Sequence, residues 1–150
     1  MAFNIRSLIL LLVVFISGCS NEPMRYSASC RDVDVKKMHV LHTEASGIDR
    51  IIDEELCEVA QQHSAEMSII GLSHIWFKKR IAHVPHRSAS ENIAFGYKVE
   101  DTFAGFMNSR SHREAILSEK YDRVGYGTVR RQDGRRFWTI IFIESKLGPD

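Results

Sequence analysis

The sequence predicts an α+β fold in which helices cover both faces of an antiparallel sheet. Apolar residues recur at helical spacing through the first part of the chain, whereas the C-terminal stretch has the pattern of two strands joined by an Asp-Gly turn. The last of these strands is apolar on both faces, so it requires a covering layer on each side. Helices first and antiparallel strands last are typical of an α+β sandwich.

Two helices are predicted in the N-terminal half. The first covers residues 31–45 and ends near Gly47, with one side formed by Val35, Met38, Leu41 and His42. The second follows Asp53, a capping residue, and has acidic residues in its first turn, where the helix dipole favours them. Its apolar stripe ends before Gly71 and consists of Leu56, Ala60, His63, Met67 and Ile70.

The middle of the chain is predicted to be a loop followed by two helices. Residues 72–90 lack a sustained period and are interpreted as a long loop with room for a short turn of helix, leading through a corner at Glu91 into a short strand at Ile93. Residues 99–109 have the spacing of a helix. Ser111 and Glu114 then have the form of a capping box, which predicts a further short helix through Leu117.

The C-terminal part is predicted to be a β-hairpin. Residues 123–129 and 136–143 flank the segment Gln132-Asp133-Gly134, and an Asp-Gly pair favours the positive φ angles of a hairpin turn. The second strand is apolar on both faces from Ile140 to Ile143, which predicts a position in the middle of the sheet.

The N-terminus indicates export. Arg6 precedes nine apolar residues, 8–16, too few for the roughly 20 that a spanning helix needs. The following Ile16-Ser17-Gly18-Cys19 resembles a bacterial lipoprotein signal, in which the cysteine is acylated, with palmitate for example. We therefore expect a signal peptide at 1–18, lipidated Cys19 with a tether at 19–30, and a folded domain at 31–150. An ordinary signal peptide with an incidental cysteine is the alternative.

Location follows from the same segment. The lipid on Cys19 predicts a membrane-held protein of the cell envelope, because two or more acyl chains anchor stably. Ser20 is not Asp, so in a Gram-negative source we expect the outer membrane, facing the periplasm. In this oxidising setting Cys30 and Cys57 are predicted to form a disulfide; two buried thiols or a metal pair are the alternatives.

Charge excludes one class of partner. The chain has 20 Lys and Arg against 19 Asp and Glu, a formal net charge of +1. A nucleic-acid binder needs a basic excess to displace the counterions of the phosphates, so we expect no nucleic-acid partner.

Five short motifs follow one another in an order that is itself informative. They are Ser73-His74, Glu91-Asn92-Ile93-Ala94, the segment 106–113 with His112-Arg113 at its end, Val124-Gly125-Tyr126-Gly127, and Phe137-Trp138-Thr139. Together they resemble the CAP superfamily, also called the SCP-like domain, and in particular its bacterial extracytoplasmic branch. The resemblance covers about residues 35–143.

This resemblance implies a three-layer α/β/α sandwich with a central antiparallel sheet and a cleft lined by His74, Glu91 and His112. The second glutamate that completes a tetrad in better-known members has no secure match here. Glu100 and Asp101 are the candidates nearest in sequence.

Two chemistries suit such a triad. His74 and His112 as neutral imidazoles would bind Zn²⁺ or another divalent cation, with Glu91 as a third ligand or as the candidate general base. Alternatively, the three residues brace a long loop, and no cofactor is present. A carboxylate between two imidazoles predicts raised pKa values for both histidines in the absence of metal.

Two functions remain. We favour a non-enzymatic binding module, anchored to the membrane through its N-terminal lipid, whose cleft holds a lipid, a glycan or a peptide. The alternative is a metal-assisted hydrolase acting on peptide or cell-envelope material, with His74 and His112 as ligands and Glu91 as base.

Overall fold

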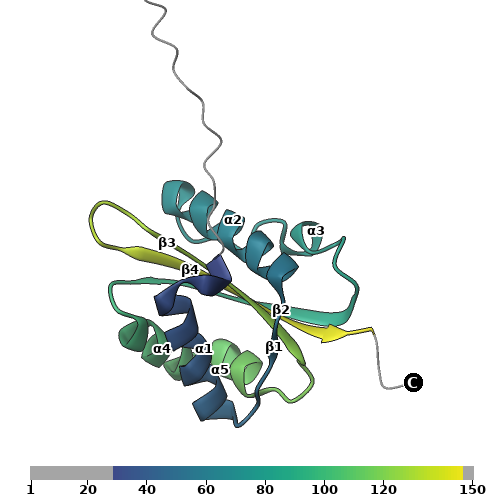
Figure 1. Ribbon diagram of the computed structural model, residues 1–150. Coiled ribbons are helices and arrows are strands. Elements are labelled where there is room, and N and C mark those ends of the chain that lie inside the picture. The colour runs from purple at the N-terminus through teal and green to yellow at the C-terminus, as the bar shows by residue number, and fades with distance from the viewer. Residues whose placement is uncertain (1–28, 147–150) are drawn as a thin grey trace, which may run out of the picture.

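A four-stranded sheet lies at the centre of the molecule, with α2 and α3 on one face and α1, α4 and α5 on the other (Figure 1). The computed structural model describes residues 29–146. The predicted signal peptide at 1–18 and the lipidation site Cys19 lie outside the described residues. The elements in chain order are η1 (Ser29–Arg31), α1 (Val33–Ser46), β1 (Ile51–Ile52), α2 (Glu54–Ile70), α3 (Phe77–Arg80), β2 (His86–Gly96), α4 (Val99–Asn108), α5 (Arg110–Leu117), β3 (Arg123–Arg130) and β4 (Arg136–Ser145).

The sheet has the order β1-β3-β4-β2. Strands β2, β4 and β3 are antiparallel, as predicted, with Glu91 opposite Ile141 and Tyr126 opposite Ile140. The two-residue β1 adds a parallel strand beside β3. The sequence does not predict β1, because two residues are too few to show a period.

Strand β4 lies inside the sheet and is buried from Phe137 to Ile143, which confirms its predicted central position. Its side chains alternate between two cores. Trp138, Ile140 and Phe142 pack in the core that includes α1, α4 and α5, whereas Ile141 and Ile143 pack against α2 and the segment after it. The fold is therefore the expected three-layer sandwich.

The first two predicted helices are confirmed. The Asp32 side chain accepts hydrogen bonds from the backbone of the first turn of α1, and Gly47 ends α1 in the left-handed conformation, with φ 69°. Asp53 caps α2 through the backbone N–H of Leu56. One member of the predicted α2 stripe is wrong: Ile70 is 66% exposed, because the helix extends past the edge of the core in its last turn.

Two predicted boundaries in the middle of the chain are also wrong. Residues 86–90 belong to β2, so Glu91 lies within an eleven-residue strand instead of at a corner. Polar and apolar residues are mixed there because β2 is an edge strand. Helix α5 begins at Arg110 with Ser109 as its N-cap residue, and Ser111 lies inside the helix, so the predicted capping box does not form.

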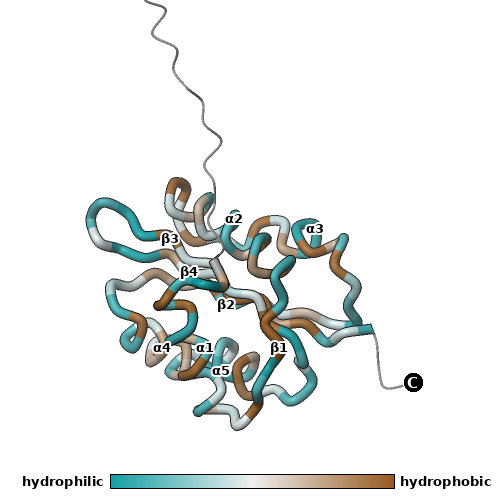
Figure 2. Tube along the Cα trace, in the orientation of Figure 1, coloured by the Kyte–Doolittle hydropathy of each residue, from teal (hydrophilic) through white to brown (hydrophobic). Residues whose placement is uncertain are grey.

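The hairpin is confirmed. The hydrophilic loop between β3 and β4 extends away from the core (Figure 2). Gly134 has φ 82°, and its backbone N–H donates to the carbonyl of Arg131. Only the glycine of the Asp-Gly pair has a positive φ, because the loop is longer than a two-residue turn.

The predicted disulfide is supported. Cys30 and Cys57 are joined with their Cα atoms 5.9 Å apart, which connects η1 to α2. A bridge that closes a loop of this size contributes about 3 kcal/mol through the unfolded state. No helix within residues 29–146 has both the length and the apolar character that crossing a membrane requires.

Candidate functional site

His74 and Glu91 meet at the end of α2. His74 follows the helix in an exposed turn, whereas the Glu91 side chain on β2 is 1% exposed. His74 Nδ1 lies 3.0 Å from Glu91 Oε1. The structure thus brings two of the three predicted residues into direct contact.

Arg80 is a site residue that sequence reasoning misses. Its guanidinium donates to Glu91 Oε2 and to the carbonyl of Ile75, and its side chain is only 13% exposed. In the sequence, Arg80 follows two lysines within residues 72–90, which are interpreted as a long loop. The guanidinium carbon of Arg80 lies 5.9 Å from the centre of the Phe77 ring. The aromatic residue three positions before Arg80 is the local sequence feature that could have indicated an inward-packed cation.

His112 is positioned by a different set of contacts. The side-chain amide of Asn92 donates to the His112 carbonyl at 3.0 Å, and the His112 ring meets the Phe106 ring edge-on at 5.3 Å. Burial lowers the pKa of His112, and the charge of the nearby His74 lowers it further. The predicted upward shift is therefore wrong for His112, because Glu91 is paired with Arg80 and His74.

The residues present do not fit a metal ion in this arrangement. Within residues 29–146, no group of three or more His, Cys, Asp or Glu side chains is placed to hold one. Both oxygens of Glu91 already face partners, one of which is a guanidinium. The candidates for a fourth residue do not complete the set, because Glu100 pairs with Lys37 and Asp101 lines a separate groove.

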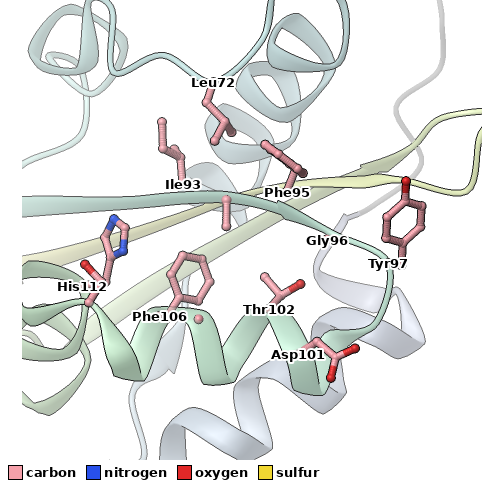
Figure 3. Close-up of a pocket in the computed structure, with 12 residues that line it drawn as sticks. Leu72, Ile93, Phe95, Gly96, Tyr97, Asp101, Thr102, Phe106 and His112 are labelled. Atoms are coloured by element: carbon pink, nitrogen blue, oxygen red, sulfur yellow. The ribbon is translucent and has the colours of Figure 1, made fainter.

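That groove, of about 500 Å³, lies between β2 and α4 (Figure 3). His112 lies at one end, and Asp101 and Tyr97 lie at the other (Figure 3). The lining is mostly apolar and consists of Leu72, Ile93, Ala94, Phe95, Gly96, Tyr97, Asp101, Thr102, Gly105, Phe106, Ser109 and His112. His74 and Glu91 are not part of it.

Three other histidines, His39, His42 and His63, make contacts within the fold. His63 is buried on the α2 stripe, as predicted, and its Nε2 lies 2.7 Å from the carbonyl of Ser73. His39 and His42 both place Nδ1 near the Tyr126 hydroxyl, at 3.1 and 3.2 Å. Trp76, which follows His74 closely in the sequence, is 69% exposed and lies outside the groove beside His112.

His42 makes the fold sensitive to acid. Burial, with the charges of Arg50 and His39, lowers its pKa from 6.5 to about 3. Below pH 6.5 the unfolded chain takes up a proton that the folded chain does not, so stability falls as the pH falls towards 3. We expect the free energy of unfolding to drop by about 2 kcal/mol from this group between pH 7 and 5, at roughly 1.4 kcal/mol per pH unit.

Urea unfolding at pH 7 and 5 measures this dependence. His42→Phe keeps a ring in place and is expected to flatten it, whereas His83→Gln, at an exposed position, is expected to leave it unchanged. An unchanged slope in His42→Phe would show that another group carries the acid sensitivity.

Solved structures share this fold. An outer surface protein of Borrelia burgdorferi superposes with a TM-score of 0.68 at 21% identity, covering 75% of this chain and 93% of that one. A cysteine-rich secretory protein of Staphylococcus aureus superposes with a TM-score of 0.62 at 20% identity, covering 75% of this chain and 39% of that one. Venom allergen-like protein 4 of Schistosoma mansoni superposes with a TM-score of 0.63 at 7% identity, covering 79% of this chain and 97% of that one.

The sequence profile of the cysteine-rich secretory protein (CAP) family matches residues 50–142. The chain belongs to this family, which indicates an extracellular or cell-envelope location. It is 34% identical over 102 residues to YlbC, an uncharacterized membrane protein of Bacillus subtilis, covering 61% of this chain and 28% of that protein. It is 36% identical over 61 residues to YkwD, an uncharacterized protein of the same species, covering 40% of this chain and 23% of that protein. The chain thus spans about a quarter of the length of these relatives.

Proposed function

We propose that the chain is a membrane-anchored, extracytoplasmic CAP-domain lipoprotein that works as a non-enzymatic binding module. One observation carries this proposal. The groove that can take a ligand is open and apolar and ends at His112, whereas the candidate base Glu91 is buried outside the groove lining. A general base must reach the proton that it removes, and Glu91 does not share a cavity with a ligand in the groove.

The hydrolase alternative is weaker for a second reason. A base acting on metal-bound water needs a free carboxylate oxygen, and those of Glu91 accept from Arg80 and His74. In our proposal Glu91, Arg80 and His74 form a brace that fixes the turn after α2 to β2. The brace holds Leu72, one wall of the groove, in position.

Binding is tested by NMR on the chain from Ser20 onward, which contains every described residue. The probes are palmitate for a lipid, an N-acetylglucosamine trimer for a glycan, and a panel of heptapeptides with alternating apolar residues. We expect at least one probe to shift the signals of Ile93, Phe106 and His112. If all three probe classes leave these signals unchanged, the binding-module proposal is wrong.

A matched pair of variants localises the binding. A side chain at Gly105 would project into open space, because nothing lies within 4 Å of its Cβ position, and Gly105 lines the groove. Gly105→Leu should therefore fill the groove without disturbing the fold. Ala104→Leu adds the same side chain at an exposed position on α4 outside the groove and serves as the control.

Zinc is expected to bind weakly. Two histidines without a free third ligand do not make a tight site, so calorimetry on the chain from Ser20 should show a Kd weaker than about 1 μM. His74→Ala should leave the small heat signal unchanged. Tight binding that His74→Ala abolishes would instead support the metal-assisted hydrolase.

The anchor is tested by fractionation. We expect Cys19→Ser to move the protein from the membrane fraction to the soluble one, because the nine-residue apolar segment is too short to span a membrane. Two similar proteins, one described as a membrane protein and the other as an outer surface protein, support an envelope location. In a Gram-negative source, Ser20 favours the outer membrane. Membrane retention of Cys19→Ser after a high-salt wash would contradict the anchor.

A further inference from the structure

The groove lies along a free sheet edge. Strand β2 is the last strand of the sheet and pairs with β4 on one side only. Within residues 29–146, no other backbone or side chain hydrogen-bonds to the outward backbone groups of residues 91–96. A row of free N–H and C=O groups is a template for one more strand.

The groove has the shape of a slot for such a strand. In Figure 3 the view is onto the outer edge of β2, with α4 along one side and Leu72 on the other. Five consecutive residues, 93–97, line it. At about 3.4 Å per residue they span about 17 Å, the length of five residues of an added strand.

Both walls suit the alternating side chains of an added strand. Leu72, Ile93 and Phe95 lie on the α2 side, and Thr102 and Phe106 of α4 lie on the other (Figure 3). Leu72, Phe95 and Tyr97 are 43%, 50% and 58% exposed, so they present apolar surface that an occupant would cover. The absence of a side chain at Gly105 leaves room beside α4.

Charge distinguishes the two ends of the slot. Asp101 lines the Tyr97 end, and two cations, Lys98 and Arg135, lie near the same end, so the positive charges outnumber the one carboxylate of the lining. The Arg135 guanidinium lies 5.0 Å from the centre of the Phe95 ring. An acidic residue on the occupant would pair with these cations.

We propose, building on the binding-module function, that the ligand is an extended peptide segment of a partner protein. It adds to the outer edge of β2 as a fifth strand, with apolar side chains facing both walls and an acidic residue near Lys98 and Arg135. Main-chain hydrogen bonds supply affinity in this mode, and the walls supply selectivity. A second copy of this chain fits less well, because joining two β2 strands antiparallel would bring both α4 helices to the same face of the joined sheet.

The test uses fluorescent heptapeptides with Glu at both ends and alternating Val, Thr, Leu or Phe between them, added to the chain from Ser20. Each peptide is compared with a copy N-methylated at alternate residues, which keeps the side chains but removes backbone donors. We expect binding by anisotropy, at least about tenfold weaker binding for the methylated copy or for Gly105→Leu, and unchanged binding for Ala104→Leu. Hydrogen exchange should show protection of amides within residues 91–97.

Each failure has a distinct meaning. Equal affinity for the methylated peptides, or binding of palmitate or the glycan but of no peptide, would overturn strand addition and leave the binding module intact. A concentration-dependent dimer that Gly105→Leu abolishes would make a second copy the occupant and would also overturn the proposal. If no probe binds and no dimer forms, both this inference and the proposed function are wrong.

Discussion

Replacing Gly127 with alanine is expected to destabilise the fold strongly. Gly127 lies on β3 directly beneath α2, and a Cβ atom there would overlap the backbone carbonyl of Ala60. Backbone cannot move aside as a side-chain tip can, so α2 must shift away from the sheet. Overpacking typically costs about 1–3 kcal/mol, and because the clash is with backbone we expect a loss at the upper end of this range.

The shift would also break specific bonds. The Gln61 side chain accepts from the backbone N–H of Thr128 at 3.0 Å and donates to the Thr128 carbonyl at 3.1 Å. The control is Gly105→Ala, which meets open space on a helix and should stabilise by about 0.5–1 kcal/mol. Urea unfolding measures the free energy of unfolding of both variants. If Gly127→Ala fails to fold while Gly105→Ala folds, the prediction is also confirmed. An unchanged midpoint for Gly127→Ala would contradict the close packing of α2 on β3.

The second large effect is expected at the brace. Arg80→Met leaves the buried carboxylate of Glu91 without its guanidinium partner, and His74 on the other oxygen is solvent-exposed. Removing one partner of a buried ion pair costs about 3–5 kcal/mol. Adding Glu91→Gln to Arg80→Met removes the unpaired charge and should recover much of that loss.

Urea unfolding of the two single variants and the double variant gives the coupling energy directly. Arg110→Met is the matched control, because Arg110 forms an ion pair with Glu114 of the same charge type but fully on the surface. We expect little change there. If Arg80→Met is as mild as Arg110→Met, the brace does not stabilise the fold, and the case for Glu91 as a structural residue fails.

The sequence predicts well where periodicity and capping agree. Asp53 and Gly71 bound α2 as expected, and the apolar run from Ile140 to Ile143 correctly predicts a central strand. Prediction fails at β2, because an edge strand with a polar first half has no clear alternation. The two-residue β1 is likewise defined by its pairing with β3 and not by a local pattern.

The site is predicted only in part, for a related reason. The motif residues His74, Glu91 and His112 are identified by resemblance, yet their roles depend on contacts that sequence spacing does not encode. Arg80 reaches Glu91 across the turn after α2, and this pairing occupies a carboxylate oxygen that the sequence leaves free for other partners. The groove is formed by the edge of β2 against α4, so it emerges only once the sheet order is known.

In the proposed function, the groove binds a ligand and leaves it chemically unchanged. The most direct measurement is the mass of each bound probe recovered after prolonged incubation with the chain from Ser20, with Glu91→Gln in parallel. We expect every bound probe to return with its mass intact, from the unaltered chain and from Glu91→Gln alike. A cleaved product that forms with the unaltered chain and disappears in Glu91→Gln would overturn the binding-module function and make Glu91 the base of a hydrolase.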